Sequence, residues 1–169
     1  TNSNSNPSVF FQNFSLMTKR TLGVIAAFIF FTVGVKAQMA EPVKWSFKSE
    51  KISNSESDYE ITLIADIQEG WYVYSQEISG RGPIPTKINF EQNPNLQLQG
   101  KPMEIGDKKE IFDQNFNINV TKLSGTTQFI QKAIVKGGLP LIKGQLLYMT
   151  CNGQVCLPPK RINFDVILK

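Results

Sequence analysis

The chain has 169 residues, of which 41% are hydrophobic and 19% are charged, values typical of a globular protein with one domain and a targeting segment. Its formal net charge of +4 suggests an acidic partner, but Lys19, Arg20 and Lys36 lie in the first 37 residues, which contain no acidic residue. The remaining 132 residues carry 15 basic and 14 acidic side chains, and this near-neutral balance argues against nucleic-acid binding. The chain also has no histidine, which argues against hydrolases that use Ser-His or Cys-His pairs.

The segment from Met17 to Ala37 has the three-part layout of a secretory signal peptide. Two positive charges follow Met17, and an uncharged stretch of 14 residues then runs from Leu22 to Val35. Val35 and Ala37 place small residues three and one positions before a cut. The apolar stretch is short for a membrane helix, which needs about 20 residues. An uncleaved anchor is the alternative interpretation.

We therefore expect a signal peptide at residues 17–37, a mature N-terminus near Gln38, and a periplasmic or secreted protein with no stable membrane span after cleavage. Residues 1–16 are polar and precede Met17, so we interpret them as an upstream extension from an over-extended gene start. The folded domain is expected over residues 41–169. Export also bears on the cysteines, because disulfides form and persist outside the cytoplasm.

From Glu41 onward, apolar and polar residues alternate with a period of two, which is typical of half-buried strands. No long amphipathic helix is indicated, and aromatic residues are expected mainly in the core. The pattern predicts an all-β fold, an immunoglobulin-like antiparallel β-sandwich. About nine short strands are expected, at residues 43–47, 59–67, 71–74, 88–90, 96–98, 116–120, 129–135, 146–150 and 162–168.

The two cysteines lie close together, in the segment Tyr148-Met-Thr-Cys151-Asn-Gly-Gln-Val-Cys156-Leu-Pro-Pro159. Zinc needs about four Cys or His ligands, and haem attachment needs C-x-x-C-H, so we expect no metal and no cofactor here. Since the chain has no other cysteine, we expect Cys151 and Cys156 to be bonded to each other in the oxidised protein, with Cα atoms within about 7 Å.

Two interpretations of this pair remain open. A local structural clip would stabilise the fold by about 2 kcal/mol in a six-residue loop, against about 4 kcal/mol for a 60-residue loop that joins two sheets. The second interpretation is a redox pair. Pro158 and Pro159 follow directly and no helix is indicated, so the thiols lack the activation that a helix N-terminus provides. They are suited to attack by a partner whose own thiol is activated, through a mixed disulfide.

The motif Tyr148-x-x-Cys151-x-x-x-x-Cys156-Leu-Pro-Pro159 resembles the cysteine motif of the periplasmic N-terminal domain of the thiol:disulfide interchange protein DsbD. Residues 69–74, Glu-Gly-Trp-Tyr-Val-Tyr, are similar to a glycine–aromatic strand of that family, and residues 110–112, Glu-Ile-Phe, to the segment that follows its active-site cap loop. The resemblance spans residues 43–168. The best-known members have five residues between the cysteines and aromatic residues in the cap loop, whereas the matching stretch 102–107 has no aromatic residue.

The resemblance implies an immunoglobulin-like domain that relays reducing equivalents, taking them from thioredoxin-like and membrane-embedded partners. It implies that Cys151 and Cys156 are the catalytic pair, with Cys156 attacked by partners and Cys151 resolving, and that Tyr72 and Tyr74 lie beside them. Thioredoxin-like or DsbD-type redox proteins are the expected partners. The domain would be one module of a protein-disulfide reductase rather than a complete enzyme. The alternative function is a non-catalytic secreted β-sandwich, binding or structural, with a local disulfide clip.

Overall fold

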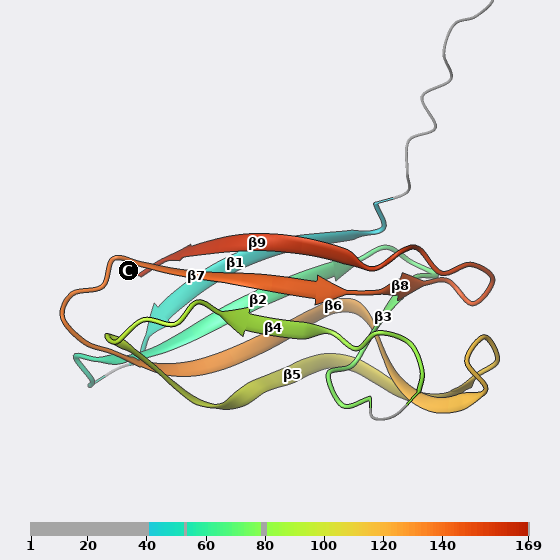
Figure 1. Cartoon of the computed structure of the whole chain (residues 1–169), viewed down its shortest axis with the longest axis horizontal. Coiled ribbons are helices and arrows are strands. Elements are labelled where there is room, and N and C mark those ends of the chain that lie inside the picture. The colour runs from blue at the N-terminus through green and yellow to red at the C-terminus, as the bar shows by residue number, and fades with distance from the viewer. Residues whose placement is uncertain (1–40, 53, 79–80, 169) are drawn as a thin grey trace, which may run out of the picture. The chain divides into compact units, whose positions relative to one another are not determined.

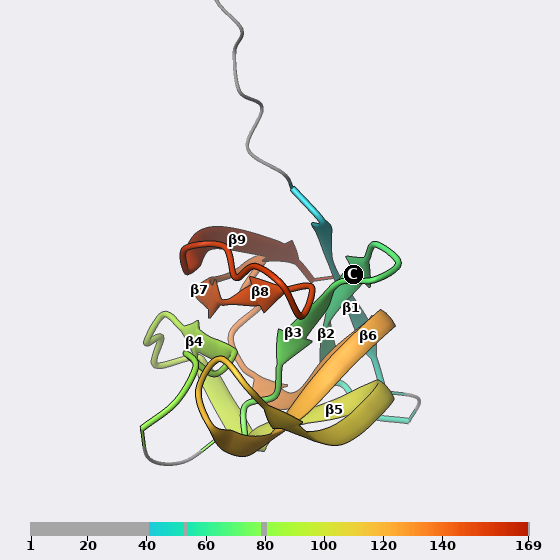
Figure 2. The ribbon, with the colours of Figure 1, turned by 90° about the vertical axis from the view of Figure 1, so that its right-hand side faces the viewer.

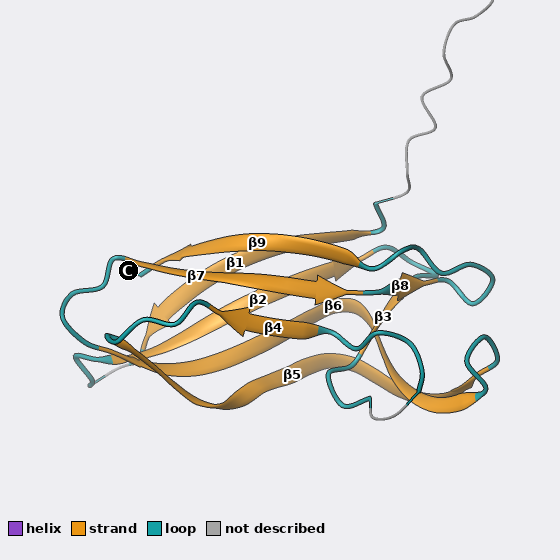
Figure 3. Ribbon diagram, in the orientation of Figure 1, coloured by secondary structure: helices purple, strands orange, loops and turns teal. Residues whose placement is uncertain are grey.

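A computed structural model describes residues 41–52, 54–78 and 81–168, and all of its regular structure is β-strand (Figures 1 and 3). The signal peptide expected at residues 17–37 and the extension before it lie outside the described residues. Within the described part of the chain, no helix is long and apolar enough to cross a membrane. The strands are β1 (Val43–Lys51), β2 (Asp58–Ile67), β3 (Tyr72–Tyr74), β4 (Lys87–Phe90), β5 (Leu96–Asp113), β6 (Ile118–Val135), β7 (Leu141–Tyr148), β8 (Thr150–Cys151) and β9 (Lys160–Ile167).

The strands form two antiparallel sheets that face each other. The larger sheet has the order β1-β2-β6-β3-β8, with β5 also paired to β6, and the smaller sheet has the order β4-β7-β9. Viewed end-on in Figure 2, β7 and β9 lie on one side of the core while β1, β2 and β6 lie on the other. The predicted all-β, immunoglobulin-like antiparallel sandwich is confirmed.

The core lies between the two sheets because alternate residues of the central strands point inward. In strand β2 the inward residues Ile61, Leu63 and Ala65 are fully buried. The other main contributors are Phe129 and Ala133 of β6, Ile142, Leu146 and Tyr148 of β7, and Phe164 and Val166 of β9. Aromatic pairs such as Phe47 and Phe164, whose ring centroids are 5.0 Å apart, fill this core, as the sequence predicted.

The hairpin of β5 and β6 differs from the sequence prediction. The strands expected at 116–120 and 129–135 belong mainly to one 18-residue strand, and the strand expected at 96–98 continues to Asp113 through residues 102–107. Two register shifts, between Gln99 and Met103 and between Ile105 and Asp107, interrupt the pairing. Nearly all of β5 is exposed, so its sequence lacks the apolar alternation that would have indicated a long strand.

Strand β3 connects the cysteine segment to the larger sheet. Val73 of β3 pairs with Leu123 of β6 on one side and with Thr150 of β8 on the other. Figure 1 shows β3 and β8 together at one end of the sandwich, next to the turn that joins β5 and β6. Three short segments that are distant in sequence therefore meet at this end.

Candidate functional site

The structure joins Cys151 to Cys156 in a disulfide. The Sγ–Sγ distance is 2.02 Å and the Cα–Cα distance is 4.1 Å, within the limit expected from the sequence. The predicted pairing of the two cysteines is confirmed. Cys151 ends β8, and Cys156 lies opposite it in an isolated antiparallel bridge.

Local hydrogen bonds set the shape of the four-residue turn between the cysteines. The side-chain oxygen of Asn152 accepts from the backbone N–H groups of Gln154 (3.1 Å) and Val155 (2.9 Å). Gly153 has a φ of +91°, in the region that only glycine adopts readily, which explains the Asn-Gly sequence. The backbone N–H of Leu157 then donates to the carbonyl of Thr150 at 2.9 Å and closes the loop. These local hydrogen bonds thus help to hold the two cysteines opposite each other.

Strand β3 fixes this loop against the sheet. Tyr72 is the register partner of Cys151, and the hydroxyl of Thr150 donates to the carbonyl oxygen of Tyr72 at 2.8 Å. Tyr72 and Tyr74 point to the same face of β3 because side chains alternate along a strand. Their rings are in edge-to-face contact, with centroids 5.6 Å apart.

The two sulfurs differ in exposure. Cys151 is fully buried, in a small apolar cluster with Tyr74 and Val120, whereas Cys156 is only partly buried. Val155, which precedes Cys156, is 49% exposed. Of the two bonded cysteines, Cys156 is therefore the more exposed residue.

The hydroxyl of Tyr74 contacts the disulfide directly. It lies 3.3 Å from Cys151 Sγ and 3.9 Å from Cys156 Sγ, and it donates to Asp113 Oδ2 at 2.7 Å. Burial, and then the hydrogen bond to Asp113, raise the pKa of Tyr74 far above its usual value. Tyr74 is therefore a neutral O–H donor beside the sulfurs at every physiological pH.

Asp113 and Lys122 form a buried ion pair behind Tyr74. Lys122 Nζ lies 3.1 Å from Asp113 Oδ2, and the side chains are 9% and 1% exposed. Burial alone would raise the pKa of Asp113, but hydrogen bonds from Tyr74, Lys122 and the backbone N–H of Asn115 outweigh it and lower the pKa. Asp113 is therefore ionised.

Lys122 also contacts the aromatic rings. Its Nζ lies 3.8 Å from the ring centroid of Tyr72 and 5.9 Å from that of Tyr74, both within the range of a cation–π interaction. The hydroxyl of Tyr72 is buried and has no hydrogen-bond partner, so this residue contributes its ring rather than its hydroxyl.

The sequence did not predict that Asp113 and Lys122 belong to this site. One signal was present for Lys122: it occupies an inward position of β6, two residues after the buried Val120, in a run that otherwise alternates apolar and polar residues. A lysine at an inward position needs a buried partner. Asp113 follows the Glu-Ile-Phe segment directly, but nothing in the sequence pairs it with Lys122.

Residues 102–107 do not form a loop over the disulfide. Glu104 accepts hydrogen bonds from the hydroxyl of Ser75 (2.8 Å) and the backbone N–H of Gln76 (2.7 Å), and pairs with Lys108 at 2.8 Å. This stretch therefore anchors the chain that follows β3. The aromatic contact with Tyr74 comes instead from Phe116, in the turn between β5 and β6, with ring centroids 6.1 Å apart.

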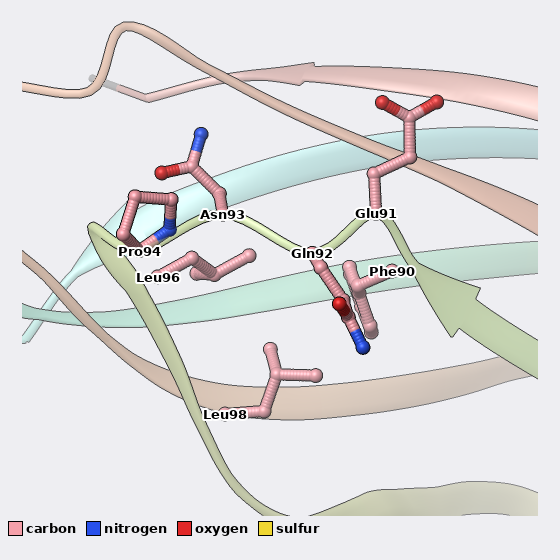
Figure 4. A pocket seen from close by; sticks show the side chains of 7 residues that line it. All are labelled: Phe90, Glu91, Gln92, Asn93, Pro94, Leu96 and Leu98. Atoms are coloured by element: carbon pink, nitrogen blue, oxygen red, sulfur yellow. The ribbon is translucent and has the colours of Figure 1, made fainter.

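Other features offer little chemistry. A cavity of about 570 Å³ lies along the turn from β4 to β5 and is lined by Phe90, Glu91, Gln92, Asn93, Pro94, Leu96 and Leu98 (Figure 4). Figure 4 shows these side chains spread along an open turn rather than converging on one point. Among the described residues, no group of three or more His, Cys, Asp or Glu side chains could hold a metal ion. The reactive groups of the described structure are thus those around the cysteine pair.

This protein is an all-β domain whose reactive group is a single cysteine pair. The disulfide lies at one end of the β-sandwich and packs against buried tyrosine residues. The family model described as "Thiol:disulfide interchange protein DsbD, N-terminal" matches residues 37–167. The match covers well over half of the chain, so the chain belongs to the DsbD N-terminal domain family. Membership implies thiol–disulfide exchange with thioredoxin-like redox partners.

Three solved structures are similar to this chain at low identity. The N-terminal domain of DsbD from Neisseria meningitidis, in the reduced form, is 18% identical with a TM-score of 0.47, and the match covers 73% of this chain and 84% of that one. The N-terminal periplasmic domain of ScsB from Proteus mirabilis is 18% identical with a TM-score of 0.42, covering 72% and 44%. A collagen-binding domain from a Staphylococcus aureus adhesin is 12% identical with a TM-score of 0.42, covering 78% and 100%. The comparison with curated proteins finds no match.

Proposed function

We propose that this domain relays reducing equivalents outside the cytoplasm, by thiol–disulfide exchange between thioredoxin-like partners through a reversible Cys151–Cys156 disulfide. The observation that carries the proposal is the unequal exposure of the bonded sulfurs, because Cys156 is accessible and Cys151 is fully buried. A disulfide with a purely structural role does not need one sulfur to be more exposed than the other. Family membership supports the exchange chemistry.

The exchange follows from this arrangement. A partner thiolate attacks Cys156 Sγ, the bond to Cys151 Sγ breaks, and Cys151 leaves as a thiolate. The second thiol of the partner then attacks the mixed disulfide and releases Cys156. The partner dithiol is oxidised to a disulfide, and this domain is reduced to a dithiol. The reverse sequence passes the electrons to an acceptor.

The proposal gives Cys156 the role of the attacked sulfur and Cys151 that of the resolving one. Tyr72 and Tyr74 are the active-site neighbours. No helix N-terminus lies at the cysteines among the described residues, so the activated thiolate must come from the partner. The site is therefore one module of a disulfide-reductase system. The periplasmic or secreted location rests on the signal-peptide pattern at residues 17–37.

The test is a mixed-disulfide trap in a bacterium with a periplasm, using the whole chain with its leader. Cys151→Ser should accumulate long-lived adducts with thioredoxin-like proteins, because its remaining Cys156 has no resolving partner. Cys156→Ser should accumulate few or none, since Cys151 is buried. The variant without either cysteine is the control. The mass of the trapped chain should correspond to an N-terminus near Gln38.

Three results would contradict parts of this proposal. Adducts from Cys156→Ser alone would reverse the roles of the two sulfurs. Absence of adducts from both single variants would favour the structural clip. An adduct that retains Thr1 or Met17 in a membrane fraction would refute cleavage of the leader.

A further inference from the structure

A continuous buried polar chain ends at the sulfur that solvent does not reach. It runs from Lys122 to Asp113 (3.1 Å), from Asp113 to the hydroxyl of Tyr74 (2.7 Å), and from that hydroxyl to Cys151 Sγ (3.3 Å). A buried ion pair contributes little to stability, because the cost of removing two charges from water offsets their attraction. Its position behind the disulfide therefore calls for an explanation other than folding.

We propose that Tyr74 is the hydrogen-bond donor to the Cys151 thiolate that leaves when Cys156 is attacked, and that the Asp113–Lys122 ion pair positions this hydroxyl and offsets the buried negative charge. The inference rests on the proposed function, since it concerns the same exchange step. By touching a reacting sulfur, Tyr74 is a catalytic residue. Asp113 and Lys122 act through Tyr74 and are positioning residues.

The need for a donor follows from the burial of Cys151. A thiolate formed at a fully buried sulfur has no water to solvate it, and burial in apolar surroundings disfavours the charged form. Val120, its neighbour in the cluster, offers no polar atom there. Two tyrosine hydroxyls belong to this cluster, but that of Tyr72 has no hydrogen-bond partner, whereas that of Tyr74 already lies 3.3 Å from Cys151 Sγ.

The hydroxyl can serve the sulfur because Asp113 does not depend on it. A tyrosine hydroxyl has one hydrogen, which Tyr74 gives to Asp113 in the disulfide state. When the thiolate forms, this hydrogen turns toward Cys151. Asp113 keeps the ammonium group of Lys122 and the backbone N–H of Asn115, at 2.9 Å, as donors.

The step balances without proton transfer from tyrosine. The electron pair of the attacking thiolate forms the new bond to Cys156, and the pair of the broken S–S bond moves to Cys151. Tyr74 remains protonated throughout and only redirects its hydrogen bond.

Lys122 prevents a conflict between two negative charges. Without it, the carboxylate of Asp113 and the thiolate of Cys151 would compete for the same hydroxyl and repel each other. The ammonium group is held against the ring of Tyr72, 3.8 Å from its centroid, so it stays beside Asp113 while the hydroxyl turns.

The test compares Tyr74→Phe with Tyr59→Phe in the full chain. Both changes remove one hydroxyl, but Tyr59 lies on β2, where its register partners are Lys51 and Ala133, distant from the cysteines along the sheet. Reduction of the disulfide by excess dithiothreitol should be about tenfold slower or more in Tyr74→Phe, as expected for the loss of a hydrogen bond to a charged group, and unchanged in Tyr59→Phe.

A second measurement separates this role from a general effect on the fold. In a Cys156→Ser background, Tyr74→Phe should raise the pKa of the Cys151 thiol by about one unit or more. In a Cys151→Ser background, it should change the pKa of Cys156 less, because that sulfur is farther from the hydroxyl and partly exposed. Ultraviolet absorbance of the thiolate reports both values. Equal shifts at the two cysteines, or equal reduction rates of Tyr74→Phe and Tyr59→Phe, would overturn the proposal.

Substitutions in the Asp113–Lys122 ion pair test the proposal independently. They also test it if Tyr74→Phe does not fold. Lys122→Met leaves Asp113 uncompensated, so it should slow reduction and raise the pKa of Cys151. The double variant Asp113→Asn with Lys122→Met removes both charges and should restore both readouts toward wild type. Failure of the double variant to recover would refute the positioning role. These measurements need only dithiothreitol or a pH titration and no protein partner, so they stand even if wild-type exchange with thioredoxin-like proteins, and with it the proposed function, fails.

Discussion

Reduction of the disulfide should destabilise this domain only modestly. The perturbation is conversion of the Cys151–Cys156 bond to two thiols in the otherwise unchanged chain. The bond closes a loop of six residues, since the cysteines are five positions apart. In the chain-entropy model, such a loop contributes about 2 kcal/mol to the free energy of unfolding.

The reduced domain should therefore stay folded. The main core lies between β2, β6, β7 and β9 and does not include either cysteine, which belong to a separate small cluster. For a domain of this size, about 2 kcal/mol corresponds to a fall in Tm of roughly 8 °C. By linkage, the fold stabilises the disulfide by the same amount, which lowers its reduction potential by about 40 mV relative to the unfolded chain.

Urea unfolding of the oxidised and reduced protein, followed by the fluorescence of Trp45 and Trp71, measures this difference. The two forms should have similar m-values, because similar surface is exposed on unfolding. Unfolding of the domain on reduction, or a loss above about 4 kcal/mol, would show that the bond is structural and would refute the reasoning from loop length. A reduction potential below about −300 mV would point the same way.

Two further predictions concern the sandwich itself. Gly144→Ala should destabilise the domain by about 1–3 kcal/mol in urea unfolding, because the added Cβ would meet the backbone oxygen of Asn89 at 2.7 Å and the ring of Phe164 at 2.8 Å. The control Lys143→Ala, on the exposed face of the same strand, should change the stability little. Equal effects of the two substitutions would contradict the steric argument. Burial would raise the pKa of Glu104, but hydrogen bonds from Gln76 N, Lys108 and Ser75 outweigh burial and lower the pKa below the ordinary 4.5. The ionised Glu104 side chain therefore contributes fully to stability above pH 4.5, and this contribution is lost as the pH falls through the lowered pKa. The stability difference between wild type and Glu104→Gln should accordingly shrink on acidification below pH 4.5, and a difference that is constant with pH would refute the ionic role.

Much of the fold could be predicted from the sequence, because one face of most strands is buried. Strand β2 shows this directly: Ile61, Leu63 and Ala65 have no exposed surface, and they recur at every second position of the sequence. Strand β5 was not predicted over most of its length because most of its residues are exposed. Its residues 102–107 alternate only at Met103-Glu104-Ile105, which is too short a run to indicate a long strand, and they pair with β6 in the structure.

The sequence could predict the cysteine pairing, which covalent chemistry constrains, and the shared face of Tyr72 and Tyr74, which strand geometry constrains. Two cysteines alone in a chain have one intramolecular partner each, and residues two apart on a strand share a face. The buried pair of Asp113 and Lys122 could not be found in this way. Their contact depends on the turn from β5 to β6, and the sequence does not specify which charges a turn brings together.

The long strand β5 has a consequence for assembly. Among the described strands it pairs with β6 alone, so its outer edge has no strand partner, although side chains such as Gln76 donate to some of its carbonyls. Such an edge can template pairing with another chain and lead to aggregation. The two bulges interrupt its register, and the exposed lysines Lys101, Lys108 and Lys109 place charge along it, which are common ways to block edge-to-edge association. The register shifts and these charges therefore oppose edge-to-edge pairing between two copies of this domain.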